Sequence, residues 1–191
     1  MKEREMRPAV MDWCKLQGLI PVCEVFVGSH TADIVAVQFE ERVGRRVPKV
    51  KLLVGIELKL TDYTGVTRQC VDLSKWCHMV HAVIPEVNIR KMQAKVLDRF
   101  VENKIGLLPF TSEGSIGVSP INSAELGCPV IKGARMDRFE RNLWRRIVSG
   151  TTYVTDEQRE QRYRDAAAYH NRNVCDCKYC LEARTAGIFL P

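Results

Sequence analysis

The sequence predicts an α/β protein in which helices flank one mixed central β-sheet. Up to Phe110, segments with the apolar spacing of amphipathic helices alternate with short segments rich in β-branched residues. The segment Val50–Leu60 is apolar almost throughout, as expected of a strand covered on both faces. The composition, with 46% hydrophobic and 27% charged residues, is that of an ordinary globular protein and not of a disordered or membrane protein.

The first predicted elements are one helix and three strands. Apolar residues recur at helical spacing from Met6 to Leu16, and Gly18 follows in a C-capping position. A Gly-Ser turn at 28–29 joins the first two strands, and a polar, basic segment centred on Gly44 joins the second strand to the third. The strands are predicted at Pro21–Val27, Ala32–Phe39 and Val50–Leu60.

The next elements alternate between helix and strand, which favours parallel strands joined by helical crossovers. A helix over Thr61–Cys77 is expected to be capped by Thr61 or Thr64. The remaining elements are a strand at Met79–Ile84, a helix at Ile89–Asn103, a strand at Gly106–Phe110 and an antiparallel edge at Gly114–Val118. The predicted order is therefore α-β-β-β-α-β-α-β, with no internal repeat.

A segment rich in Ser, Gly and Pro divides the chain, which predicts a core over residues 1–120 and a mainly helical extension over residues 134–191. The extension is basic and rich in cysteine. Its first helix has an apolar stripe from Met136 to Ile147, and a further polar helix is expected over roughly Asp156–His170. Several arginines lie away from the stripe: Arg135, Arg138, Arg141, Arg145 and Arg146.

Charge and cysteine content limit the setting of the protein. The formal net charge of +6 is mild and permits, without requiring, a nucleic-acid partner. The charged start and the lack of a long apolar segment indicate a cytoplasmic protein with no membrane association. Five of the eight cysteines are scattered among apolar neighbours and are expected to be reduced core residues: Cys14, Cys23, Cys70, Cys77 and Cys128.

An acidic residue two positions before a lysine is the motif that carries chemistry. The chain contains three such triplets, at Glu57–Lys59, Glu102–Lys104 and Asp176–Lys178. The second ends a helix and the third lies in a cysteine cluster, so only the first lies in a predicted strand. Residues two apart on a strand share a face, so Glu57 and Lys59 are expected to point the same way. The alternative, a surface ion pair on an edge strand, fits poorly with so apolar a strand.

Strand register predicts which carboxylates join this motif. A hairpin centred on residue 45 pairs positions whose numbers add to 90, which places Asp33 opposite Glu57. A tight turn at 28–29 pairs positions adding to 57, which places Glu24 beside Asp33. Opposed carboxylates repel unless a cation neutralises them, and Mg²⁺ or Mn²⁺ binds oxygen ligands of this kind. We expect Asp33 and Glu57, with Glu24 as a weaker candidate, to hold the metal, and Lys59 to orient water and stabilise charge on phosphorus.

These residues carry a resemblance to a known family. The sequence resembles the PD-(D/E)xK, or restriction-endonuclease-like, nuclease superfamily in four successive segments. They are Thr31–Val37 (TADIVAV), Val54–Leu60 (VGIELKL), a helix with Gln69 and the strand Met79–Pro85 (MVHAVIP). The resemblance covers roughly residues 5–110 in motif order and spacing. It implies an αβββαβ core, Mg²⁺-dependent cleavage of DNA phosphodiester bonds, and Asp33, Glu57 and Lys59 as the motif residues.

The resemblance also names supporting residues and shows departures. In many relatives a Gln on the helix after the motif faces the site, which gives Gln69 a catalytic role here. Ala32 replaces the proline that names the motif, and no Tyr follows Gln69 four residues on, so the exonuclease-type subgroup is not favoured. Glu5 is a candidate for the acidic residue that often assists from the first helix, although a solvated Glu is the simpler interpretation. His30 is close enough in sequence to reach the same end of the sheet.

Basic residues give candidate contacts to DNA phosphates. Arg45 and Arg46 lie at the predicted hairpin tip, and Arg138 and Arg145 lie on the helix of the extension. A solvated helix face accounts for these last arginines equally well.

The C-terminal cysteines form a separate candidate site. Cys175, Cys177 and Cys180 have the density of a Zn²⁺ site, with His170 or Cys128 as a fourth ligand. The paired CxxC spacing is absent, so free thiols are the simpler interpretation, and an iron–sulfur cluster fits the spacing less well still.

The sequence therefore predicts a Mg²⁺-dependent deoxyribonuclease, an endonuclease in preference to an exonuclease, with homodimer formation possible by analogy with the superfamily. Two alternatives remain: a non-catalytic nucleic-acid-binding or assembly module that keeps the nuclease fold, and a zinc-dependent interaction protein that depends on the C-terminal cysteines.

Overall fold

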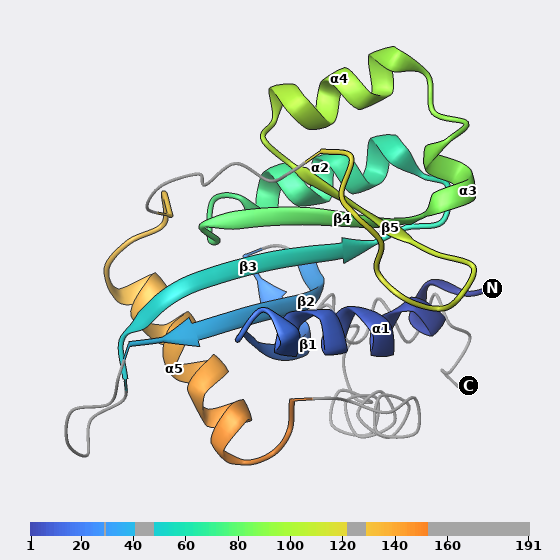
Figure 1. The fold of residues 1–191 in the computed structure, drawn as a ribbon. Helices are drawn as coiled ribbons and strands as arrows, with labels where there is room; N and C mark the ends of the chain where they lie inside the picture. Colours follow the sequence, from blue (N-terminus) through green and yellow to red (C-terminus); the bar gives the residue numbers. More distant parts are fainter. Residues whose placement is uncertain (29, 41–47, 122–128, 153–191) are drawn as a thin grey trace, which may run out of the picture. The chain divides into compact units, whose positions relative to one another are not determined.

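A five-stranded sheet in the order β1-β2-β3-β4-β5 organises the chain (Figure 1). The computed structural model describes residues 1–28, 30–40, 48–121 and 129–152, and Met1–Thr152 forms one compact unit. The sheet is preceded by helix α1 (Glu3–Leu16). Its strands are β1 (Ile20–Val27), β2 (His30–Phe39), β3 (Val50–Leu58), β4 (Met79–Pro85) and β5 (Gly106–Phe110). The predicted class, a mixed α/β fold with helices on both sides of one sheet, is confirmed.

The first three strands are antiparallel neighbours, and both predicted registers are confirmed. In the β1–β2 ladder, Val22 pairs with Val35, so the paired numbers add to 57. In the β2–β3 ladder, Ile34 pairs with Ile56, so the numbers add to 90 until the register shifts between Gln38 and Phe39. Asp33 and Glu57 are therefore the next pair in register beyond Ile34 and Ile56.

The last three strands are parallel, as their helical connections require. Helix α2 (Tyr63–Leu73) joins β3 to β4, and helices α3 (Glu86–Ile89) and α4 (Ala94–Glu102) join β4 to β5. The carboxyl ends of β3, β4 and β5 consequently meet at one edge of the sheet. Because β2 runs antiparallel to β3, its beginning lies at that same edge, which brings the early residues of β2 to the end of β3.

Helices cover both faces of the sheet. Helix α1 packs on one face through Met6, Val10 and Cys14, which contact Ile34, Ile56 and Leu58 among others. Helices α2, α4 and α5 (Ala134–Val148) supply buried residues to the core on the other face: Val66, Cys70 and Leu73; Phe100; and Met136, Phe139 and Leu143. Helix α5 thus belongs to the same compact unit as the sheet. Among the described helices, none is both long and apolar enough to cross a lipid bilayer.

Several local predictions need correction. The N-cap of α2 is Asp62, whose side chain accepts a 2.8 Å hydrogen bond from the Gly65 amide, and not Thr61 or Thr64. The helix predicted at 89–103 is divided, because residues 90–93 separate α3 from α4. Strand β3 ends at Leu58, and the predicted edge at 114–118 contributes only an isolated bridge, between Ile116 and Phe110.

The described cysteines agree with the prediction of reduced core residues. Cys14, Cys23, Cys70 and Cys77 are free and buried. Burial raises the pKa of Cys23 to about 11 and that of Cys14 to about 12, so both thiols stay protonated at neutral pH. Cys128 lies outside the described residues.

Gly55 allows α2 to pack closely on β3. A Cβ atom there would overlap the Leu73 side chain and lie 3.2 Å from Cys77 Sγ. We expect Gly55→Ala to lower the free energy of unfolding by about 1–3 kcal/mol, because the core has no room for the methyl group. Urea denaturation measures the loss. Leu73→Ala makes room for the new methyl group, so the double variant should lose less free energy of unfolding than the two single variants lose together. A loss equal to that sum would contradict the overlap.

Candidate active site

The site begins where the β1–β2 ladder is interrupted. Cys23 pairs with Ile34 and Val25 with Ala32, but no ladder pair forms between Glu24 and Asp33. Glu24 has a φ of 52°, a left-handed conformation that an L-residue seldom adopts without support. The kink interrupts the regular alternation of β1 at Glu24, opposite Asp33 of β2.

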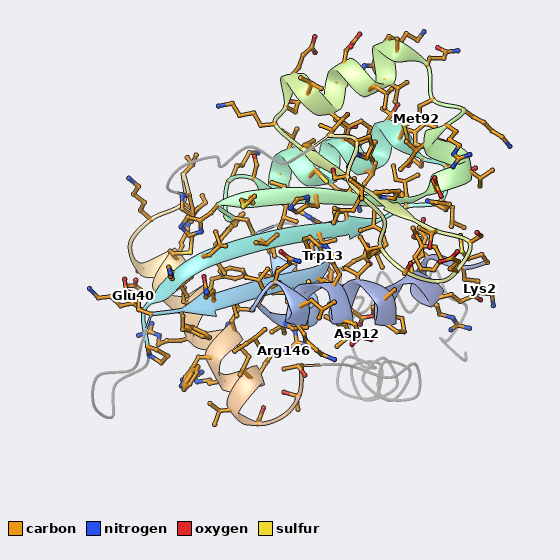
Figure 2. The ribbon with its side chains drawn as sticks, viewed as in Figure 1. Lys2, Asp12, Trp13, Glu40, Met92 and Arg146 are labelled. Carbon is orange, nitrogen blue, oxygen red and sulfur yellow. The ribbon has the colours of Figure 1, made fainter. Side chains whose placement is uncertain are left out.

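Arg146 supports this kink from a distant part of the chain. Its guanidinium donates hydrogen bonds of 3.1 Å to the Glu24 carbonyl oxygen and 2.7 Å to the Cys23 carbonyl oxygen. Figure 2 labels Arg146 on α5, the helix that packs against β1. The sequence analysis placed Arg146 among arginines that lie away from the apolar stripe, with phosphate contact or a solvated face as the alternatives; instead the side chain is half-buried and satisfies carbonyl groups of the bent strand.

Asp33 links the beginning of β2 to the end of β3. Its Oδ2 accepts a 2.9 Å hydrogen bond from the Leu58 amide, and its Oδ1 lies 3.7 Å from Arg7 Nη2. Burial nevertheless raises the pKa of Asp33, against the opposing effects of the Leu58 amide and the charges of Arg7 and Lys59. The side chain of Asp33 keeps 26% of its surface exposed, so it can still reach a ligand at the surface.

Glu57 is the buried carboxylate of the site. Only 1% of the residue is exposed, and Oε1 has no hydrogen-bond partner among the described residues. His30 approaches it, with Nε2 3.4 Å from Oε1. Burial raises the pKa of Glu57 to about 7, and the neighbouring Asp33 carboxylate adds to the rise, although His30 opposes it. Asp33 and Glu57 are thus close enough to interact directly: the Asp33 carboxylate raises the pKa of Glu57, whereas the hydrogen bond with Glu57 lowers the pKa of Asp33.

Lys59 follows the end of β3 and faces α1, whereas Glu57 lies on the side of α2. The expectation that the two side chains share a face is therefore not met, because Lys59 lies beyond the last strand residue, Leu58. Its amide donates to the Val83 carbonyl oxygen, and its Nζ lies 3.4 Å from Glu3 Oε2. The charge of Lys59 also lowers the pKa of Asp33, so the ammonium group is near enough to Asp33 to interact with it electrostatically. The acidic residue of α1 beside Lys59 is therefore Glu3, and not Glu5, whose carboxylate accepts from the Lys2 amide.

Glu24 occupies the predicted register position, but its carboxylate pairs with an arginine. Arg7 Nη1 lies 2.9 Å from Glu24 Oε1, and both side chains are largely buried. Arg7 therefore bridges Glu24 and Asp33 from α1. Sequence spacing assigned no role to Arg7, although its place within the apolar stripe of the first helix, between Met6 and Val10, was a usable signal.

Gln69 lies on the helix that covers the Glu57 face. Gly55 contacts side chains on or just after α2, and Glu57 shares its face because the two are two residues apart on a strand. Gln69 Oε1 is buried and has no hydrogen-bond partner among the described residues, so its amide is able to bind a further group.

The other candidate residues do not gather at this site. Arg138 and Arg145 are exposed on α5, on a helix whose Arg146 touches the β1 kink. Arg45 and Arg46, and the possible zinc ligands His170, Cys175, Cys177 and Cys180, lie outside the described residues.

The acidic side chains of the site are the candidate ligands for a divalent cation. Within the part of the chain that the structure describes, no group of three or more His, Cys, Asp or Glu side chains is arranged to hold a metal. Mg²⁺ needs only one or two carboxylates, with water and phosphate filling its other positions. Asp33 with Glu57, whose buried Oε1 is without a partner, fits that requirement.

Comparisons with known proteins add evidence on the fold. No protein-family model matches the chain, and no curated protein matches it. A solved structure of a protein of unknown function from Silicibacter pomeroyi is similar, with 14% sequence identity and a TM-score of 0.50. The alignment covers 77% of this chain and 89% of that one. At this identity the likeness concerns the mixed α/β fold alone.

Proposed function

We propose that this protein is a divalent-metal-dependent nuclease that hydrolyses DNA phosphodiester bonds, as an endonuclease. One observation carries the proposal: two carboxyl groups from adjacent strands, Asp33 and Glu57, interact in a largely buried setting where burial raises the pKa of both and the Asp33 carboxylate raises that of Glu57 further. Such a pair is unfavourable in a sheet on its own and becomes favourable when a cation lies between the oxygens. A bound Mg²⁺ or Mn²⁺ would polarise the phosphate and lower the pKa of a coordinated water.

The surrounding charges support this assignment. The nearest cationic side chains each face another carboxylate as well: Arg7 faces Glu24, and Lys59 faces Glu3. They therefore only partly neutralise Asp33 and Glu57. In the proposed reaction, Asp33 and Glu57 hold the cation, and Lys59 stabilises charge that develops on the phosphate. His30 holds the Glu57 side chain in place, and the Gln69 amide orients water or phosphate.

We further propose that the protein is a member of the PD-(D/E)xK, restriction-endonuclease-like superfamily. The support is the order of helix, three antiparallel strands, helix and parallel strand, together with the position of the acidic residues on β2 and β3. Lys59 follows β3 at the spacing of the motif.

A cleavage assay with matched variants tests the function. Purified protein is incubated with supercoiled plasmid and with single-stranded DNA in Mg²⁺, in Mn²⁺ and in EDTA. We expect cleavage that requires the metal and that falls at least about 100-fold in Asp33→Asn and in Lys59→Met, because each removes a group that contacts the metal or the phosphate. Lys75→Met, which removes an exposed lysine paired with Asp72, is the control and should retain activity.

Two results would contradict the proposal. Cleavage that survives both Asp33→Asn and Lys59→Met would assign the activity to other residues. Salt-sensitive DNA binding without cleavage in either metal would favour the non-catalytic binding module instead.

A further inference from the structure

A groove lies at the tip of the β1–β2 hairpin, the hairpin that carries Asp33. This groove, of about 400 Å³, lies between the tip of the β1–β2 hairpin, the segment after α2 and the first half of α5. Three aromatic side chains line it: Phe26, Trp76 and Phe139. Its volume lies within the roughly 300–1,000 Å³ range of pockets that bind small ligands. The active-site residues described above do not line this groove.

The aromatic rings of the groove are fixed at its base and accessible at its rim. Trp76 and Phe139 pack against each other with ring centres 5.4 Å apart, and Phe139 is buried. Phe26, on the edge strand β1, is 55% exposed. Gly28 allows the hairpin tip to close over Trp76, because a Cβ atom there would lie 3.1 Å from the indole nitrogen. A planar apolar ligand can therefore stack in this groove.

The polar residues of the groove select the charge of the ligand. Arg135 and Arg138, one turn apart on α5, both line it and are exposed. Neither guanidinium group has an ion pair or hydrogen bond within the described part of the chain. Asn142, one turn further along, adds an amide that can donate to and accept from a ring edge. Aromatic rings, two guanidinium groups and an amide together fit a nucleotide.

The groove also adjoins the proposed active site. Gly28 lines the groove, and His30, two residues later, contacts Glu57. Two residues span at most about 7 Å, so a bound nucleotide and a phosphate at Glu57 can belong to one strand. The base faces of a duplex are covered by their neighbours, so only an unstacked base can use these rings.

We propose that this groove binds one unstacked base of the nucleic-acid substrate, and hence that the protein acts on single-stranded nucleic acid or on unpaired regions. This inference rests on the proposed nuclease function, since it assigns a substrate class to that site. Phe26 stacks on the base, Arg135 and Arg138 pair with phosphates, and Asn142 contacts the base edge.

Binding measurements on the full chain in EDTA test the groove without cleavage. The probes are a fluorescent single-stranded 12-mer, its duplex, and an abasic strand with the same number of phosphates. We expect the 12-mer to bind at least about 5-fold more tightly than the abasic strand, as base–aromatic stacking predicts. Phe26→Ala should abolish this preference and Phe26→Trp should retain it, whereas Val101→Ala, a matched exposed position on α4, should change nothing.

The phosphate contacts have their own readout. Arg135→Gln with Arg138→Gln should weaken binding of the 12-mer and the abasic strand alike and reduce the salt dependence. Equal affinity for the 12-mer and the abasic strand, tighter binding of the duplex, or an equal affinity for free dAMP would each overturn the inference. Metal-dependent cleavage by the native chain would still be measurable in each case, so a failure here is distinct from a failure of the nuclease proposal.

Discussion

Glu57→Gln is expected to abolish metal-dependent cleavage, by about 1,000-fold or more, and at the same time to stabilise the protein above neutral pH. Glutamine keeps the size of the side chain but removes the charge that would hold the cation. It also removes the need to ionise a buried carboxyl group, since Glu57 is 1% exposed. Opposite effects on activity and stability are typical of a functional residue.

The pH dependence of this stability follows from the raised pKa of Glu57. The carboxyl group has a pKa of about 7 in the folded protein and 4.5 as the ordinary value. Between these values the folded state holds a proton that the unfolded state has released, so the contribution present below pH 4.5 is lost as the pH rises through 7. This difference in pKa means that the folded protein is less stable above pH 7 than below pH 4.5, by roughly 3 kcal/mol.

Urea denaturation in EDTA at pH 5 and at pH 8 measures this effect. The stability gained by Glu57→Gln should be largest at pH 8 and small at pH 5. His81, a buried residue whose ring meets that of Trp13 edge-on, has an opposite pH dependence because burial lowers its pKa to about 4. The native protein and the Glu57→Gln variant both contain His81, so its effect cancels when their free energies of unfolding are subtracted. A gain that is the same at both pH values would contradict the raised pKa of Glu57.

Arg7→Met is expected to be the most destabilising substitution near the site, by about 3–5 kcal/mol. Arg7 is 6% exposed, and its guanidinium lies 2.9 Å from Glu24 and 3.7 Å from Asp33. Methionine fills much of the same space but leaves the Glu24 carboxylate without its guanidinium partner in a buried setting. The Asp33 carboxylate loses a compensating charge in the same step, so we expect cleavage to fall as well.

A double-mutant cycle measures this ion pair. Adding Glu24→Gln to Arg7→Met should recover at least half of the lost free energy of unfolding, because it removes the buried Glu24 charge that Arg7 had neutralised. Lys15→Met, which breaks the exposed pair with Asp12 on the same helix, is the control and should cost less than about 0.5 kcal/mol. If the double variant were no more stable than Arg7→Met, the charge of Glu24 would not be the cause of the loss.

Strand register was predictable because tight hairpins relate partner positions by simple arithmetic. The polar segments around Gly28 and Gly44 in the sequence predicted the two sums, and the apolar face of each strand excluded a slip by one residue. The pairing of Asp33 with the end of β3 followed from those sums. The Asp62 cap was available from the sequence too, because Asp is as favourable at an N-cap as the threonines that were considered.

The remaining features depend on contacts that sequence spacing does not encode. The Arg146 contact to Glu24 joins residues 122 positions apart. The left-handed backbone of Glu24 has no local signal, since neither glycine nor asparagine occupies the position. The choice of Glu3 over Glu5 depends on how α1 is rotated against the sheet, because the two residues are two positions apart and face different sides of the helix.

Because Arg146 hydrogen-bonds to the bent strand β1, an active fragment must include helix α5. A fragment ending at residue 120 would keep every residue of the acidic motif, yet it would lack the guanidinium that satisfies the carbonyl oxygens of Cys23 and Glu24. The Cys23 amide would also lose its 2.7 Å hydrogen bond to the Thr152 carbonyl oxygen. The smallest piece able to preserve the shape of the hairpin therefore extends through Thr152, well past the last residue of the motif itself.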